Sequence, residues 1–369
     1  MADESAAISK HGLRTRFSCE GILILSRFSS RSRSCSAADK GKESMMQRFD
    51  INLVAHADDD TLFMQPDIYN SYVAGRGQVG VAVTAANNIY WNDMAYTRRL
   101  ETAGMDAYAQ MGLLKAGRAG AQSGMVRWRI GTAEHGRFTV ATADCIDYPD
   151  LRWIFLRLPG APYMAFEPDA PDGKWHKDFA GQLSETGFPR LQDLWQDAVT
   201  TLTPVDAPDG QAYSKEQLID VLAAILDAYQ PFVVRTEDFR FANGPSNISS
   251  SRCYDHPDHY FTGLFSQRAI QQYARSGEKD SQFWVYNGYN IANLDPNLYP
   301  NLSEPDRNNK AWMFYYFSIN NPDFNGFFDR TLLIDKDRQW QGNIYAQWLW
   351  RQVHKRFDPW EQFPPCQGQ

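Results

Sequence analysis

The chain has 369 residues, of which 43% are hydrophobic, 22% charged and 14% aromatic, values that exclude a wholly disordered or fibrous protein. No run of about 18 consecutive apolar residues occurs, which excludes a membrane-spanning helix. The net charge of −7 argues against a nucleic-acid binder driven by overall charge. The five cysteines are widely spaced and form no C-x-x-C motif, so we expect reduced thiols in a cytoplasmic protein rather than disulfides or a cysteine zinc cluster.

The first 46 residues differ from the rest in composition. They contain ten Ser, eight Lys/Arg and five Asp/Glu, for a net charge of +3, so the remainder carries −10. The Ser/Arg-rich run 27–34 cannot bury a core, and the apolar stretch Gly21–Leu25 is too short for a secretory signal. Three interpretations stay open: a disordered extension, an organelle transit segment, or sequence upstream of a start at Met45 or Met46.

Residues 47–369 are predicted to form a single α/β domain. Buried strands are expected at 51–54, 79–85, 232–234 and 283–286, and helices at 93–114, 214–229 and 257–274. This order predicts a Rossmann-like three-layer sandwich with a mainly parallel sheet.

An insertion is predicted at about 120–210. It contains three β-rich runs at 126–130, 137–141 and 153–158. A loop rich in Pro and Gly is expected at 159–185 and a helix at 191–202. We expect an antiparallel extension of the sheet that forms a lid or a substrate wall.

Two short motifs contain three of the seven histidines. Residues 55–60 read Ala-His-Ala-Asp-Asp-Asp directly after the first strand, and residues 254–259 read Tyr-Asp-His-Pro-Asp-His after a later one. Loops at the carboxyl ends of parallel strands converge on one edge of a sheet, so the motifs are expected to meet despite about 200 intervening residues. Within each motif an i, i+3 pair places two side chains on one side of a turn.

Two imidazoles and one carboxylate with an open fourth position are typical of a hydrolytic zinc site. We predict one Zn²⁺ per chain, with His56, Asp59 and His259 as its ligands. Such an ion lowers the pKa of a water molecule to about 7 and polarises a carbonyl. Asp58 is expected to be the general base. The other predicted catalytic residues act on the oxyanion or the leaving amine: His256, its orienting partner Asp258, and Tyr254.

The pairing of Ala-His-x-Asp-Asp after the first strand with a later His-Pro-Asp-His resembles the PIG-L/LmbE-like deacetylases, over about residues 47–290 with gaps. The resemblance implies metal-dependent removal of acetyl from N-acetylglucosaminyl compounds. It implies the ligands His56, Asp59 and His259 and the general base Asp58. These are the same four residues that the chemistry of the motifs selects. Two positions depart from the family pattern, since Ala57 replaces Pro and Asp60 replaces Glu. Neither is an expected ligand or base, so activity is expected to survive.

An acetylated amino sugar needs an aromatic face and polar groups. Tyr286 and Asn287 after the late strand offer both, and Arg98 offers a cation for a phosphate or glycosidic oxygen. Their simpler interpretations, as core and turn residues and as a helix-surface arginine, stay open. Family members that act on glycolipids carry a membrane anchor, and none is seen here. A soluble conjugate is therefore the expected partner, and the pattern predicts no oligomeric state.

Three alternatives remain. Asp58-x-Asp60 after a strand is also typical of haloacid-dehalogenase-like phosphatases that use Mg²⁺, although that interpretation leaves His56 without a role. A catalytically silent sugar-binding relative is the second. The third is the same zinc chemistry on another amide, such as a thiol conjugate or a longer acyl chain.

Overall fold

The computed structural model describes residues 49–85, 94–119, 121–160, 189–207, 210–239, 255–277, 280–289, 291, 301–321 and 346–362. The predicted N-terminal extension, most of the predicted loop at 159–185 and the predicted catalytic residue Tyr254 lie outside this part of the chain. The predicted domain boundary near residue 46 also lies outside it.

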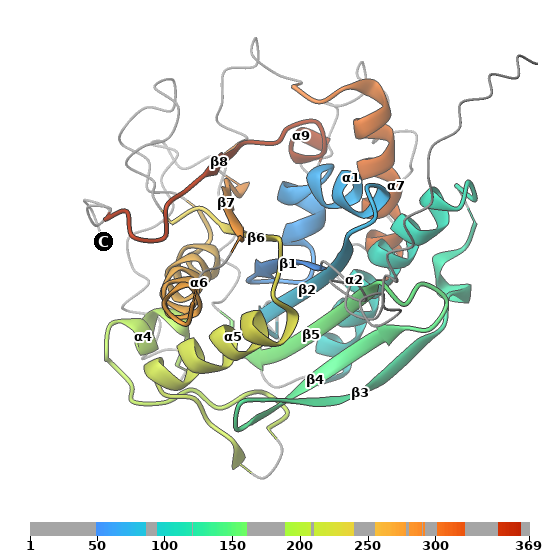
Figure 1. Cartoon of the computed structure of the whole chain (residues 1–369). Coiled ribbons are helices and arrows are strands. Elements are labelled where there is room, and N and C mark those ends of the chain that lie inside the picture. Colours follow the sequence, from blue (N-terminus) through green and yellow to red (C-terminus); the bar gives the residue numbers. More distant parts are fainter. Residues whose placement is uncertain are drawn as a thin grey trace, which may run out of the picture. The chain divides into compact units, whose positions relative to one another are not determined.

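An eight-stranded sheet in the order β3-β4-β5-β2-β1-β6-β7-β8 forms the centre of the described chain (Figure 1). The five strands from β5 to β7 are parallel, whereas β3 and β4 at one edge and β8 at the other are antiparallel to their neighbours. The strands are β1 (Phe49–Val54), β2 (Gly77–Thr84), β3 (Trp128–His135), β4 (Phe138–Cys145), β5 (Leu151–Leu158), β6 (Val233–Glu237), β7 (Gln282–Tyr286) and β8 (His354–Arg356). The predicted mainly parallel sheet with an antiparallel extension is confirmed, except that the third β-rich run of the predicted insertion, 153–158, is β5 and pairs in parallel with β2.

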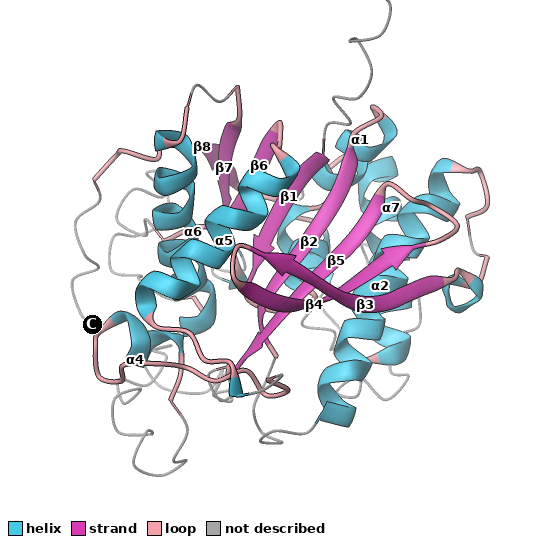
Figure 2. Cartoon of the chain, turned by 60° about the horizontal axis from the view of Figure 1, so that its bottom comes forward, coloured by secondary structure: helices cyan, strands magenta, loops and turns pink. Residues whose placement is uncertain are grey.

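Helices cover both faces of the sheet, which makes three layers (Figure 2). One face carries α1 (Asp67–Val73), α2 (Met94–Lys115), α7 (Glu304–Asn320) and α9 (Ala346–Leu349). The opposite face carries α4 (Leu191–Trp195), α5 (Lys215–Tyr229) and α6 (Pro257–Arg275). Two short helices complete the described elements, η1 (Asp60–Met64) and η3 (Ser123–Met125). None of these described helices has the length and apolar character that crossing a membrane requires.

Polar side chains tie together the two strands that precede the motifs. All six residues of β1 are buried; Ile51 and Leu53 join the core beneath α5 and α6, while Asp50 and Asn52 face the other layer. Arg235 of β6 satisfies both, because its Nη2 donates to Asp50 Oδ2 (3.2 Å) and its Nη1 donates to Asn52 Oδ1 (3.1 Å). A buried ion pair is stable only with such additional hydrogen bonds. The carboxyl ends of β1 and β6 are thereby fixed side by side.

The segment 346–362 packs against η1 and against the turn that follows β7. Trp348 Nε1 donates to the backbone oxygen of Tyr289 (3.1 Å), and Gln352 Nε2 donates to that of Met64 (2.9 Å). From α7, the buried Lys310 Nζ donates to the backbone oxygen of Trp348 (3.0 Å), and burial lowers the pKa of this amine to about 7. This segment therefore braces η1 and the turn after β7.

One predicted helix is shorter than expected, and one helix was not predicted. The helix expected at 191–202 ends at Trp195, because the chain turns at Asp197, which has a positive φ of 60°. α7 was not expected, because its first half is polar and its second half is apolar on all sides, so no amphipathic stripe is visible.

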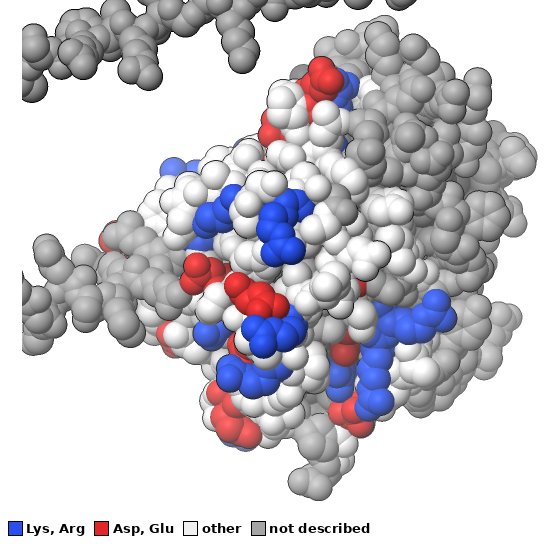
Figure 3. All heavy atoms as spheres, turned by 90° about the vertical axis from the view of Figure 1, so that its right-hand side faces the viewer, with Lys and Arg blue, Asp and Glu red and all other residues white. Residues whose placement is uncertain are grey.

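Surface charges are mixed in sign. On the face shown in Figure 3, Lys and Arg side chains lie beside Asp and Glu side chains rather than in a separate patch. At the β3–β4 edge, for example, Arg127 pairs with Asp147 (2.6 Å) and Arg129 with Asp144 (2.7 Å), all partly exposed. Pairs of this kind contribute little to stability.

Candidate metal centre

The first motif follows β1 without a break. The backbone oxygen of Ala55 accepts from Thr84 N at the end of β2 (3.0 Å), and Ala55 N donates to Glu237 Oε1 at the end of β6 (3.0 Å). The chain then turns, with Asp60 as the first residue of η1. The neighbouring strands thus anchor the backbone immediately before His56.

The second motif forms the start of α6. His256 is the N-cap residue, and its Nδ1 accepts from the backbone N–H of Asp258 (3.2 Å). Pro257 stands in the first turn, where its missing N–H costs nothing. His259 lies one turn into the helix and is fully buried.

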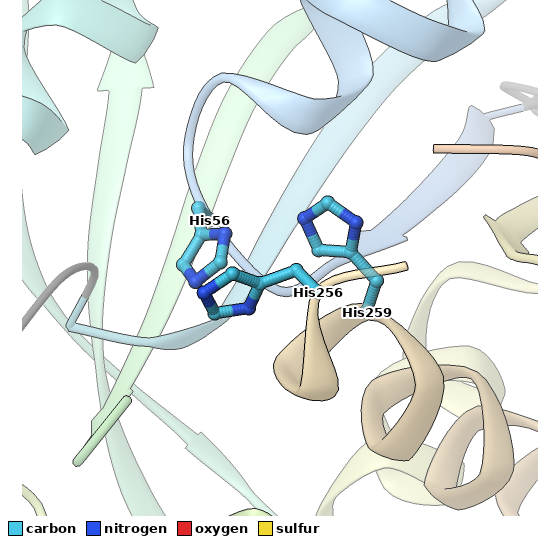
Figure 4. Close-up of side chains that lie close together, drawn as sticks. All are labelled: His56, His256 and His259. Atoms are coloured by element: carbon cyan, nitrogen blue, oxygen red, sulfur yellow. The ribbon is translucent and has the colours of Figure 1, made fainter. Parts of the chain in front are cut away.

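The structure brings the two motifs together at the edge formed by β1 and β6. Figure 4 shows the imidazoles of His56, His256 and His259 gathered in one place. The ring centroid of His56 lies 4.8 Å from that of His256 and 5.3 Å from that of His259. The predicted convergence is therefore present in the fold.

Asp59 lies between two of these histidines. Its Oδ2 lies 3.3 Å from His56 Nδ1 and accepts from the His56 backbone N–H (2.6 Å), while its Oδ1 lies 3.0 Å from His259 Nε2. Burial opposes the charge of Asp59, but the two imidazoles outweigh it and hold the pKa of the carboxyl well below its usual range. Asp59 is therefore anionic.

Each imidazole beside Asp59 contacts a second carboxylate through its other nitrogen. His56 Nε2 lies 3.1 Å from Asp258 Oδ2, and His259 Nδ1 lies 2.8 Å from Asp255 Oδ1. A carboxylate behind a histidine ligand fixes the tautomer and makes the free nitrogen a better donor to a metal. His56 Nδ1 and His259 Nε2 are the nitrogens that remain, and both point at Asp59.

The donor set fits a divalent ion such as zinc. Asp59 Oδ1 and His259 Nε2 are buried, and neither has a hydrogen-bond partner of good geometry among the described residues. Groups of three His and carboxylate ligands occur here with ligand atoms within 4.8 Å of one another, including His56 with Asp58 and Asp59. The Asp59 and His259 atoms lie 3.0 Å apart without good hydrogen-bond geometry, and a cation held by both would satisfy each of them.

Asp58 and His256 border the cluster. Asp58 is partly exposed, unlike the fully buried Asp59, and burial together with the Asp59 charge raises the pKa of Asp58 to about 7. Burial lowers the pKa of His256 to about 3, so this imidazole is neutral. Asp258 lies nearer to His56 than to His256, whose Nδ1 is 3.8 Å from the Asp258 carboxylate.

Asp255 was not among the predicted site residues. Besides contacting His259, its carboxylate accepts from the backbone N–H groups of His256 (2.8 Å), Gly288 (3.0 Å) and Tyr289 (3.1 Å). It thus joins the second motif to the turn after β7. The Tyr289 ring stacks on His259 with a centroid distance of 5.0 Å. An acidic residue beside a histidine motif is a weak sequence signal, because it is usual in solvated loops.

Gly288→Ala should disturb this arrangement. A Cβ at position 288 would collide with the Asp255 carboxylate, so Asp255 must move away from His259. Overpacking of this kind costs about 1–3 kcal/mol, and we expect zinc affinity to fall by about 10–100-fold through the displaced carboxylate. Thermal unfolding and chelator competition measure the two effects. Gly124→Ala, where a Cβ meets no atom within 4 Å, is the matched control, and equal values for both variants would contradict the prediction.

Glu237, the last residue of β6, was also missed. Its side chain is fully buried, and burial raises its pKa well above the usual range. It forms a three-ligand group with Asp59 and His259. The sequence indicates its role through its position at the carboxyl end of the strand next to β1, because binding sites of parallel sheets lie at that edge.

The predicted substrate-binding residues are not gathered around the histidines. Arg98 is exposed on α2. Tyr286 is 1% exposed, and its hydroxyl donates to Asp67 Oδ2 (2.8 Å). Asn287 is buried, and its backbone N–H donates to the backbone oxygen of Val353 (2.9 Å). In the described structure the last two residues therefore support the fold around the site.

No family model matches the chain, and no curated protein matches it. Solved structures that match the chain include a teicoplanin deacetylase in a zinc-inhibited form, at 12% identity and a TM-score of 0.35, covering 76% of this chain and 89% of that one. The A40926 pseudoaglycone deacetylase has 14% identity and a TM-score of 0.35, covering 76% and 88%. The 4-carboxy-2-hydroxymuconate hydratase of Pseudomonas putida KT2440 has 11% identity and a TM-score of 0.34, covering 81% and 83%.

Proposed function

We propose that this protein is a zinc-dependent N-deacetylase that hydrolyses the acetamide of a soluble N-acetylglucosaminyl-type conjugate. The observation that carries the proposal is the buried contact of Asp59 with His56 and His259, which lie in motifs about 200 residues apart and are each supported by a carboxylate. The resemblance of both motifs to those of PIG-L/LmbE-like deacetylases supports the reaction class.

His56, Asp59 and His259 would hold the ion. When bound, zinc supplies a Lewis acid that polarises the amide carbonyl and makes water acidic near neutral pH. Asp258 and Asp255 hold the two imidazoles in place through their far nitrogens. The protein therefore provides a largely buried set of donors, with the partly exposed Asp58 beside them in the chain.

Asp58 is the proposed general base. It is adjacent to Asp59 in the chain, and it is the more exposed residue of the pair. A carboxylate beside the reacting water takes its proton as the water attacks the carbonyl carbon, and it can return that proton to the leaving amine.

His256 is the proposed oxyanion stabiliser. Its Nδ1 accepts a backbone hydrogen bond, so the proton of the neutral imidazole is assigned to Nε2. A neutral imidazole is a hydrogen-bond donor rather than an acid, which favours stabilisation of the developing negative charge over protonation of the amine.

Acetate release by the zinc-loaded full-length protein tests the proposal. We expect release from members of a panel of soluble N-acetylglucosamine conjugates, its loss with a chelator, and its return with added zinc. The same panel includes amides of thiol conjugates and of longer acyl chains, so it also tests the alternative substrates. A chain that binds one zinc ion but hydrolyses no amide in the panel would contradict the proposed function.

A further inference from the structure

We infer that Glu237 is a fourth protein ligand of the ion, in addition to His56, Asp59 and His259, so that the reacting water would take a fifth position. The inference rests on the proposed zinc site and extends it to a residue outside both motifs. Three fully buried ligand atoms meet here without a hydrogen-bond partner of good geometry among the described residues: Asp59 Oδ1, His259 Nε2 and Glu237 Oε2. The three residues offer ligand atoms that all lie within 4.8 Å of one another.

Both the carboxyl group and the backbone of Glu237 are fixed. Its Oε1 accepts from the backbone N–H of Ala55, the residue before His56, at 3.0 Å. This bond leaves Oε2, which has no hydrogen bond of good geometry to a described residue. Gly263 of α6 packs so closely against the end of β6 that a Cβ there would approach the Glu237 backbone oxygen to 2.6 Å.

Two buried carboxylates side by side need either a cation or a shared proton between them. The carboxyl groups of Glu237 and Asp59 lie within hydrogen-bonding reach of each other, an arrangement that a shared proton or a bound cation can hold. What favours a cation is the third donor, since a ligand atom of His259 lies within 4.8 Å of one from each carboxylate.

Glu237→Gln separates these two roles. The amide keeps the shape of the side chain, can still accept from Ala55 N, and can donate to Asp59 as a protonated carboxyl would. If Glu237 is a ligand, chelator competition should show zinc affinity lowered by more than about 100-fold, beyond the 10–100-fold that is typical of outer residues. The visible absorption of the cobalt-loaded protein should also change, since it reports the ligand set, and the metal-free protein should unfold at or above the wild-type temperature.

Glu134→Gln, on the exposed edge strand β3, is the matched control and should bind zinc and cobalt as the wild type does. Wild-type affinity and an unchanged cobalt spectrum in Glu237→Gln would overturn the assignment of Glu237 as a ligand. That result would leave the deacetylase proposal intact, provided that the wild type binds zinc and releases acetate. A wild type that binds neither metal would instead overturn both proposals.

Discussion

Replacing Asp58 with Asn should reduce kcat for acetate release by about 10²–10⁴-fold, the usual contribution of a general base, while zinc binding is retained. Asn has the shape of Asp but cannot accept a proton. Asp58 is the partly exposed member of the acidic loop, whereas Asp59 is enclosed between His56 and His259. The measurements are steady-state kinetics and zinc content of the purified variant.

Asp144→Asn is the control for loss of a carboxylate, since Asp144 pairs with Arg129 at the sheet edge. Its turnover should equal that of the wild type. Full activity in Asp58→Asn would contradict the assignment of this residue as the general base. Loss of zinc together with activity would show instead that Asp58 belongs to the ligand set.

His259→Ala should abolish both zinc binding and activity. The substitution removes the Nε2 that faces Asp59, and it leaves the fully buried carboxylates of Asp59 and Asp255 without this imidazole. Breaking a buried charge pair by removing one partner costs about 3–5 kcal/mol, so the free energy of unfolding should also fall. We expect no stoichiometric zinc after equilibration with an equimolar amount of the ion.

His354→Ala provides the comparison for this variant. His354 lies on β8, is about one-third exposed, and contacts Asp67 rather than the cluster. It should bind zinc as the wild type does. Zinc bound by His259→Ala with wild-type affinity would remove His259 from the ligand set and leave its contact with Asp255 as a structural one.

The sequence predicts the central fold well, because the signals there are local. The strands at β1, β2 and β7 are short buried runs, and α5 begins at Ser214, whose side chain and that of Gln217 cap each other's backbone N–H. α7 shows the opposite case. Its start signal, Ser303 capping Asp306 N with a proline in the first turn, is present in the sequence. Its second half, however, is apolar at almost every position, so the sequence shows no helical period there.

The site was predictable only where residues are grouped in the sequence. The two histidine motifs are recognisable in the sequence from their composition and from their position after strands. Asp255 and Glu237 are single acidic residues whose roles depend on what faces them, namely His259 Nδ1 in one case and Asp59 in the other. Tyr286 illustrates the reverse problem, since its place beside a Gly/Asn turn suggested a ligand contact, while the fold turns its hydroxyl to Asp67. Which group faces which is decided by tertiary packing.

The bracing of the site edge by the segment 346–362 has a consequence for the timing of folding in the cell. Trp348 and Gln352 hold the turns that carry Tyr289 and η1, yet they are among the last described residues to leave the ribosome. Domains form progressively as the chain is synthesised from its N-terminus. The five parallel strands can therefore pair before Trp348 and Gln352 emerge, whereas the histidine cluster gains its final support only after they have emerged. Metal loading is accordingly expected to follow the emergence of this segment, and a chain that ends before Trp348 should load metal poorly even if its parallel strands pair.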